Sequence, residues 1–262
     1  MHVSFQDGKF NASYHNTAAD RGMIFDRHAH PHFEIVVVLN GKITMAIENK
    51  RYTVSPQSVV VFTPSTFHSL FVNEPTQYER MTVSFAASEI PSEIYTDFLQ
   101  KANLFPVLQG GFFTRFCEDA KAVLSANDKD RLLPLWRAMM IRLFYAVAFF
   151  EGDTEQNVST EKNLTAIIDY INVHVAEKFG LEEVANSVFL SKSSISHLFK
   201  NKMKISFKQY VLQKKMAYAT RLMLNGVSAG EAAKTIGYEN YSNFYSVYKK
   251  IVGVPPSDKK KS

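Results

Sequence analysis

The stretch LEEVANSVFLSKSSISHLFK, residues 181–200, decides the fold of the C-terminal part of the chain. Its first half places apolar residues at the i, i+3, i+4, i+7 positions of an amphipathic helix: Leu181, Val184, Ala185 and Val188. After a turn, a second amphipathic segment directs three apolar residues to one side: Ile195, Leu198 and Phe199. Two short amphipathic helices joined by a turn predict a helix-turn-helix unit.

The same arrangement recurs 48 residues further along the chain. Ala229, Ala232, Ala233 and Ile236 repeat the first pattern, and a second apolar face follows with Phe244, Val247, Tyr248 and Ile251. Residues 207–224 between the units read as one helix, about 27 Å long at 1.5 Å per residue. A spacer of that length could hold two recognition helices roughly one DNA turn, ~34 Å, apart, so that a monomer reads a bipartite site.

The outward faces of the two second helices are the surfaces that a DNA duplex would contact. These residues are Ser193, Ser194, Ser196, His197 and Lys200 in the first unit, and Tyr241, Ser242, Asn243, Tyr245, Ser246 and Lys249 in the second. Hydroxyl, amide and imidazole groups hydrogen-bond base edges, while lysines neutralise phosphates. The alternative is a pair of solvated polar faces, but two such faces in one basic region favour DNA.

Charge is distributed unevenly along the 262 residues. From residue 160 onward there are 16 Lys and Arg residues against 8 Asp and Glu, whereas residues 1–159 have 14 against 17. A local basic excess suits a polyanionic partner such as double-stranded DNA, with a merely solvated basic surface as the alternative.

The N-terminal part predicts antiparallel β structure over residues 33–85, where β-rich runs alternate with turn signals. Asn40-Gly41 predicts a type I′ hairpin between two of these runs. Helices follow near residues 112–125 and 131–150, and the second has an apolar stripe: Leu132, Leu135, Trp136, Met139, Met140, Leu143 and Val147. The stripe is expected to pack on its own sheet, and the 112–150 helices are also the expected interface of a homodimer.

Composition points to a cytoplasmic protein. The single cysteine, Cys117, reads as a small buried apolar side chain, and the N-terminus lacks the order of a secretory signal. The most apolar run, 139–150, is interrupted by Arg142 and is too short to span a membrane. The polar segment 151–163 reads as a linker between two domains.

The C-terminal segment resembles the DNA-binding domain of the AraC/XylS family of transcription regulators. The resemblance rests on the blocks LSKSSISHLFK, ISFKQY, A-x-x-I-G-Y-x-N-x-S-x-F and the closing KKxxGxxP. It implies that the third and sixth helices of this domain read the major groove. Two positions depart from the family pattern: Lys204 stands where glycine is usual, which predicts a turn that is strained or shaped differently, and Lys215 stands where arginine is usual.

The N-terminal part resembles the cupin-like sensor domain of the same family. Gly22, His28, His30, Glu34 and Gly41 match the first cupin motif. On one extended strand, residues 28, 30 and 34 would project to one face, and His68 from a later strand would join them. These side chains suit a divalent metal, but Ser58 and Thr66 replace glycines of the second motif. A metal-free pocket that binds a small organic effector is therefore expected.

These observations predict an α+β protein of two domains. Residues 1–150 form an antiparallel cupin-like barrel with flanking helices, 151–163 a linker, and 164–262 an all-α double helix-turn-helix domain. The expected function is transcription regulation, with promoter DNA and a small effector, a carbohydrate, as ligands and RNA polymerase as a further partner. Neither a cofactor nor an enzymatic activity is expected. The alternative is a metal-dependent cupin enzyme fused to a DNA-binding module, using His28, His30, Glu34 and His68 as ligands.

Overall fold

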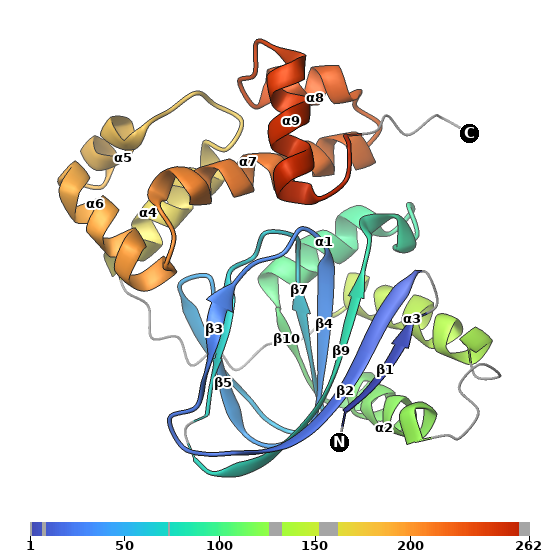
Figure 1. Cartoon of the computed structure of the whole chain (residues 1–262). Coiled ribbons are helices and arrows are strands. Elements are labelled where there is room, and N and C mark those ends of the chain that lie inside the picture. The colour runs from blue at the N-terminus through green and yellow to red at the C-terminus, as the bar shows by residue number, and fades with distance from the viewer. Residues whose placement is uncertain (1, 7–8, 73, 126–132, 152–161, 257–262) are drawn as a thin grey trace. The chain divides into compact units, whose positions relative to one another are not determined.

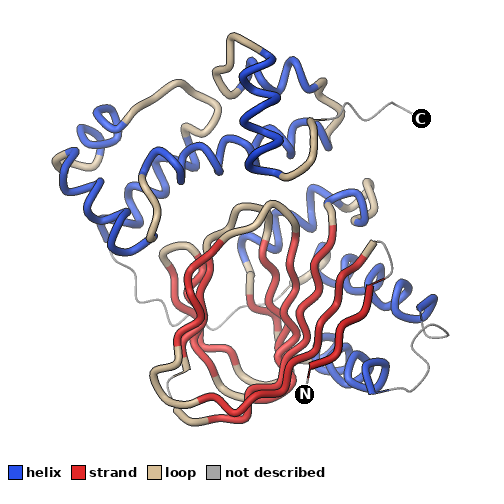
Figure 2. The backbone as a smooth tube through the Cα atoms, in the orientation of Figure 1, coloured by secondary structure: helices blue, strands red, loops and turns tan. Residues whose placement is uncertain are grey.

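The computed structural model describes residues 2–6, 9–72, 74–125, 133–151 and 162–256. These residues form an N-terminal and a C-terminal compact unit, on either side of residues 152–161 (Figure 1). Figure 2 shows that the strands belong to the first unit and that the second is entirely helical. The expected α+β class with two domains is confirmed. Most of the expected linker lies outside the described residues, and the first helix of the second unit begins inside it, at Lys162.

The described part of the N-terminal unit contains two antiparallel sheets. The larger has the order β1-β2-β9-β4-β7-β10 and the smaller β3-β8-β5-β6. The strands are β1 His2–Gln6, β2 Phe10–Ala19, β3 Ile24–His28, β4 Phe33–Asn40, β5 Ile43–Ile47, β6 Lys50–Val54, β7 Ser58–Phe62, β8 His68–Phe71, β9 Thr76–Phe85 and β10 Val107–Leu108. The two sheets pack face to face in a cupin-like arrangement, but within the described residues they remain separate and do not close into the barrel expected from the sequence.

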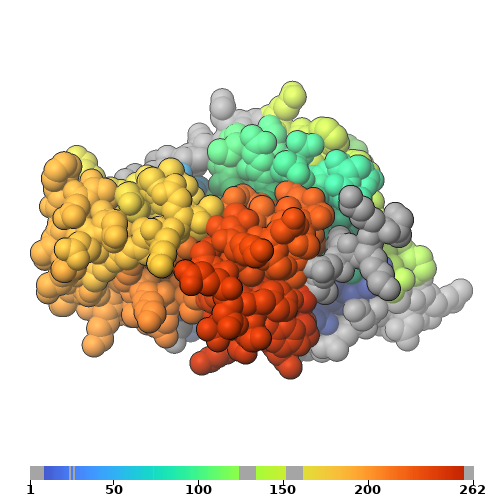
Figure 3. Space-filling model, turned by 90° about the horizontal axis from the view of Figure 1, so that it is seen from above, coloured from blue at the N-terminus to red at the C-terminus, as the bar shows by residue number. Residues whose placement is uncertain are grey.

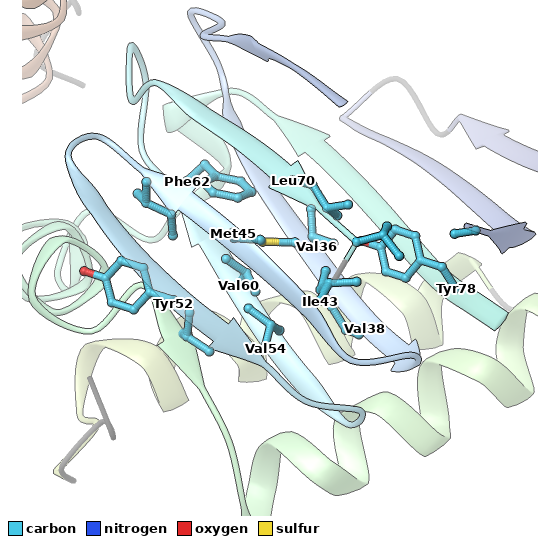
Figure 4. Packing of buried hydrophobic residues seen from close by; sticks show 14 residues of the cluster. Val36, Val38, Ile43, Met45, Tyr52, Val54, Val60, Phe62, Leu70 and Tyr78 are labelled. Carbon is cyan, nitrogen blue, oxygen red and sulfur yellow. The ribbon is translucent and has the colours of Figure 1, made fainter. Parts of the chain in front are cut away.

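Strand β4 is buried on both faces, which explains its uninterrupted apolar run. Val36 and Val38 point into the core between the sheets, where they meet Ile43 and Met45 of β5 and Phe62 of β7 (Figure 4). The alternate residues of β4 are equally buried and face the helices on the other side of the sheet.

Three helices cover that outer face: α1 Tyr95–Leu104, α2 Gly111–Ser125 and α3 Leu133–Ala148. The contact is largely aromatic. Phe33 stacks on Phe85 with ring centroids 5.5 Å apart, and Phe144 of α3 lies 5.0 Å from Phe85 and 5.5 Å from Phe98. The stripe expected on α3 therefore packs on its own unit, with Leu135 as an exposed exception and Leu132 outside the described residues.

Two predictions for this unit have a clear outcome. Cys117 is buried, and burial raises the pKa of its thiol to about 12, as expected for an inert apolar side chain. The Asn40-Gly41 hairpin is wrong, because β4 pairs with β7 and β9 whereas β5 pairs with β6 and β8. Gly41 has a φ of 94°, but it lies where the chain crosses from one sheet to the other.

The C-terminal unit contains two helix-turn-helix pairs joined by one long helix. Its helices are α4 Lys162–Val173, α5 Leu181–Ser187, α6 Lys192–Leu198, the short π-helix Phe199–Met203, α7 Phe207–Leu224, α8 Ala229–Thr235 and α9 Tyr241–Val252. The predicted span of α7 agrees with the structure at both ends. No helix in the described ranges is long and apolar enough to cross a membrane.

The turns inside the two pairs have the same geometry. After α8, the amide of Tyr238 donates to the Ala233 carbonyl at 2.9 Å and Gly237 adopts a φ of 90°, which together form a Schellman motif. After α5, the amide of Leu190 donates to the Ala185 carbonyl at 3.0 Å, and Phe189 has a φ of 55°. Phe189 thus occupies the repeat position of Gly237, with its ring 94% exposed.

Lys215, near the middle of α7, connects the two pairs. Its buried ammonium donates to the carbonyl of Glu177, ahead of α5, at 2.6 Å and to that of Ile236, at the end of α8, at 2.9 Å. Desolvation by burial lowers the pKa of Lys215, and the two carbonyls supply the hydrogen bonds that the buried ammonium needs. Lysine in place of the family's usual arginine therefore still links both pairs to α7.

Removing the Phe144 ring should destabilise the N-terminal unit. We expect Phe144→Ala to lower its free energy of unfolding by about 3–5 kcal/mol, because this fully buried ring contacts Phe85 and Phe98. Phe149→Ala, one residue beyond the end of α3, removes a ring that is 64% exposed and should change it by less than about 0.5 kcal/mol. Urea denaturation of both variants measures the difference, and equal losses would contradict the packing described here.

Replacing Lys204 by glycine should raise the stability of the C-terminal unit. It ends the short π-helix with a φ of 58°, as the strained turn predicted from the sequence requires. A side chain costs about 1–2 kcal/mol in this region, and glycine loses about 0.5–1 kcal/mol of extra backbone entropy. Lys204→Gly should therefore stabilise the C-terminal unit by up to about 1 kcal/mol. Lys250→Gly, at an exposed helical position of α9, should instead destabilise it by about 1 kcal/mol in the same denaturation experiment.

Candidate functional site

The N-terminal unit has a cavity of about 270 Å³ between its two sheets. Polar lining side chains come from the six-stranded sheet, through β2, β4 and β9, and from β3 and β8 of the smaller sheet. Apolar and aromatic side chains complete the wall: Phe25, Val36, Met45, Phe62 and Leu70. A small concave site with a few convergent polar groups on an apolar wall is typical of a small-molecule site.

Three of the four predicted pocket residues line this cavity. His28 ends β3 and lies directly opposite His68, the first residue of β8, with ring centroids 4.4 Å apart. Glu34 of β4 places a carboxylate oxygen 3.8 Å from Nε2 of His68. The buried ring of His68 also stacks on Phe62 at 3.9 Å, so its plane is fixed.

The tautomer of His68 follows from its neighbour. Its Nδ1 lies 3.0 Å from the carbonyl oxygen of Thr66, which can only accept, so Nδ1 carries the proton. When the ring is protonated, Nε2–H can pair with the Glu34 carboxylate 3.8 Å away; when the ring is neutral, Nε2 is an acceptor and cannot hydrogen-bond this carboxylate. This is the ring state in which histidine binds a metal, with its other nitrogen oriented by a backbone carbonyl.

The predicted fourth residue, His30, lies beside the cavity but does not line it. Possible ligand atoms of His28, His30 and His68 lie within 4.8 Å of one another, as do those of His30, His32 and Glu34. Such nitrogen and oxygen donors fit a divalent transition metal. The expectation that His28, His30 and Glu34 share one strand was wrong, however, because His28 ends β3, His30 lies in the loop that follows, and Glu34 belongs to β4.

The sequence reasoning missed six of the nine polar lining residues, among them Ser69 of β8. Ser13 and His15 belong to β2, which was not predicted, and Tyr78, Arg80 and Thr82 occupy alternate positions of β9. The period of two in β9 was visible in the sequence, but which face of the strand lines a cavity was not.

In the C-terminal unit, α6 exposes the predicted face while Ile195 is fully buried on the opposite side. Ser193, Ser194, Ser196, His197 and Lys200 are all exposed. Ser194 has a local role as well, because its amide and hydroxyl contact the N-cap residue Ser191 at 3.0 and 2.7 Å. The sequence reasoning missed Asn201, whose side-chain amide lies 3.1 Å from Nδ1 of His197.

Helix α9 exposes the second predicted face in the same way. Tyr241, Ser242, Asn243, Tyr245, Ser246 and Lys249 are exposed, while Phe244 and Tyr248 are buried. The rings of Tyr241 and Tyr245 lie one helical turn apart, with centroids at 6.4 Å. Figure 3 shows the surface of the C-terminal unit from one side, with α9 in red. Both helices thus present hydroxyl, amide and cationic groups on an exposed face above an apolar core.

Comparison with known families assigns a domain to each unit. Residues 11–133 match the family described as AraC-like ligand binding domain, and residues 184–262 match the one described as Helix-turn-helix domain. The cavity and its polar lining fall within the first match, and both exposed helix faces fall within the second.

Relatives that match most of the chain occur among bacterial proteins. The Escherichia coli K12 protein "Uncharacterized HTH-type transcriptional regulator YdiP" is 24% identical over 86% of this chain and 77% of its own. The Photobacterium leiognathi "Probable transcriptional regulator LumQ" is 22% identical over 94% and 95%. The "Xylose operon regulatory protein" of E. coli K12 is 24% identical over 64% and 42%.

The fold, the two matched domains and the relatives define a DNA-binding transcription regulator with an N-terminal ligand-binding domain. They indicate a regulator and not an enzyme, as the sequence predicted. The chain belongs to the AraC family of transcription regulators.

Proposed function

We propose that this regulator reads a specific promoter sequence through the exposed faces of α6 and α9, and that it responds to a sugar or sugar derivative bound between its two sheets. The observation that carries the first part is the repeat of one geometry: two helix pairs, joined by the long helix α7, each expose a polar helix face. Domain limits at 1–150, 151–163 and 164–262 complete this proposal.

The DNA part is supported by chemistry and by length. The 18 residues of α7 extend about 27 Å, and the exposed helices of the two pairs flank it in the chain. Successive major grooves on one face of a duplex are about 34 Å apart, so the spacing suits a bipartite site. Ser193, Ser196, His197 and the polar residues of α9 would contact base edges, while Lys200 and Lys249 would contact phosphates.

The effector part is supported by the lining of the cavity. Imidazole, carboxylate and hydroxyl groups can donate to and accept from sugar hydroxyls, and aromatic rings such as Phe25 and Phe62 suit the apolar faces of a sugar. One relative is a xylose operon regulatory protein, which is consistent with a carbohydrate. His28, Glu34 and His68 are the residues proposed to hold its hydroxyls, with His30 beside them.

Further partners follow from the surface and the family. Leu135, Ile141 and Phe149 are exposed on or next to α3, and a homodimer through the 112–150 helices would cover them. A cytoplasmic location and RNA polymerase as a partner belong to this proposal, because a promoter-binding regulator acts where transcription takes place.

Base-reading and phosphate-binding residues should differ in their effect on DNA binding. We expect His197→Ala and Tyr241→Ala to relax the preferred sequence, because each removes a group aimed at base edges. Lys249→Ala should weaken binding to all duplexes alike and lower the salt dependence by about one unit of slope, since it removes one phosphate contact. Selection from a randomised duplex library, followed by salt titrations, measures both. Identical behaviour of the three variants would contradict the assignment.

Sugar binding should raise the thermal stability of the protein. A ligand at 100 times its Kd adds about 2.7 kcal/mol to the free energy of unfolding, which is measured as a rise in Tm. Glu34→Gln should abolish the rise, whereas Glu74→Gln, at an exposed position outside the cavity, should preserve it. The rise is expected in the presence of a chelator. A rise that needs added zinc would instead make His28, His30 and His68 metal ligands.

A further inference from the structure

Arg80 supplies a fixed positive charge to the cavity. It lies at an inward position of β9 and is half-buried. Its guanidinium carbon lies 4.9 Å from the ring centroid of Tyr78 and 5.3 Å from that of Phe25. Contacts with two aromatic faces hold a guanidinium in place without neutralising it, because an aromatic ring has no net charge.

No carboxylate described by the structure forms an ion pair with Arg80. The adjacent acid in the sequence, Glu79, is on the opposite face of β9, where it pairs with Lys121 at 3.0 Å and accepts from the Tyr14 hydroxyl at 2.6 Å. The carboxylate that lines the cavity, Glu34, is the one near His68. A partly buried guanidinium without an acidic partner is costly, and a ligand carboxylate would offset that cost.

The strand register surrounds Arg80 with suitable hydrogen-bonding groups. Strand β2 pairs with β9 so that His15 lies directly opposite Arg80 and Ser13 directly opposite Thr82. His15 and Ser13 are themselves in contact, with Nε2 and Oγ 3.2 Å apart. All four side chains line the cavity, so two adjacent strands present one polar patch built around a cation.

This patch lies at a distance from the histidine cluster. Glu34 pairs with Ser84, four residues further along β9 than Arg80, which is a separation of about 13 Å along the strand direction. Long side chains from both rows reach into the cavity between them. The cavity therefore has a cationic end at Arg80 and a mixed imidazole and carboxylate end at Glu34 and His68.

We infer that the effector is an anion, specifically a sugar acid, and that Arg80 with Ser13, His15 and Thr82 binds its carboxylate. Arginine binds a carboxylate through two parallel hydrogen bonds between opposite charges, whereas the hydroxyls of a neutral sugar accept without a charge of their own. The hydroxyls of the same ligand are then directed toward His28, Glu34 and His68. This inference rests on the effector site proposed above and makes Arg80 its specificity-determining residue.

Matched pairs of sugars test the inference directly. Calorimetric titration of the whole chain with D-galacturonate and D-galactose, and with D-glucuronate and D-glucose, compares ligands that differ in the carboxylate. We expect at least about tenfold tighter binding of the acid in one pair, because a hydrogen bond between two charged groups is roughly twice as strong as a neutral one. Arg80→Gln should remove that preference, so that the acid binds no more tightly than the neutral sugar does to the same variant, while Arg80→Lys should restore part of it.

Arg51→Gln is the matched control, because Arg51 also lies over an aromatic ring, that of Phe71 at 5.7 Å, but does not line the cavity. It should keep the full preference for the acid. Equal affinity of wild type for acid and neutral sugar, or an unchanged preference in Arg80→Gln, overturns the inference and leaves the sugar site intact. Failure of all four sugars to bind overturns the sugar site and this inference together.

Discussion

Burial of β4 on both faces is the constraint on which the N-terminal unit depends. Alternate side chains of this strand must satisfy two different environments, the helices on one side and the second sheet on the other. Because the period is two, the register that buries Val36 and Val38 between the sheets also turns Glu34 inward, at the end of the strand where the core gives way to a cavity. A one-residue slip would place that carboxylate against the helices, among aromatic rings that offer it no partner. The same strand register therefore determines both the packing of the core and the position of the site.

The C-terminal unit depends on a different constraint, because its two helix pairs are too small to form stable cores of their own. Each pair buries only a few side chains, so both depend on α7, whose residues Met216, Ala219 and Met223 enter the core of the second pair. Lys215 adds a polar connection to the carbonyls at the start of one pair and inside the turn of the other. A tight turn completes each pair. In the second pair its left-handed position is occupied by Gly237, the residue type that adopts this conformation most easily, whereas in the first pair Phe189 adopts the same conformation with a full side chain. The two helix pairs are thus more similar in backbone conformation than in sequence.

Local sequence patterns predicted those features of the structure that depend on neighbouring residues, such as the ends and buried faces of helices. The span of α7 was recognised because its ends are set by caps, with Ser206 accepting from Gln209 at one end, and the buried positions of α5, α8 and α9 follow from helical spacing. Errors arose where partners are distant in the chain. Asn40-Gly41 looked like a hairpin, but β4 finds its partners in β7 and β9, and no local signal shows that choice. His28, His30 and Glu34 were expected on one strand, yet Pro31 lies in a loop that separates them. Arg80 was missed because the inward face of β9 is defined only once β2 and β4 lie beside it.

The position of the cavity also determines how much a ligand can contribute to regulation. A ligand changes an equilibrium between two arrangements only through contacts that differ between them. Lining residues come from both sheets, so the effector proposed above would join His28 and His68 of the smaller sheet to Glu34 and Arg80 of the larger one. Neutral hydrogen bonds contribute about 0.5–1.5 kcal/mol each, whereas those to charged groups contribute about 1.5–3 kcal/mol. A shift from about 1% to about 99% of one arrangement needs about 5.5 kcal/mol of differential binding. Hydroxyl contacts alone would have to be numerous to reach that value, so the inferred ionic contact at Arg80 would be the largest single contribution to the coupling free energy from this cavity.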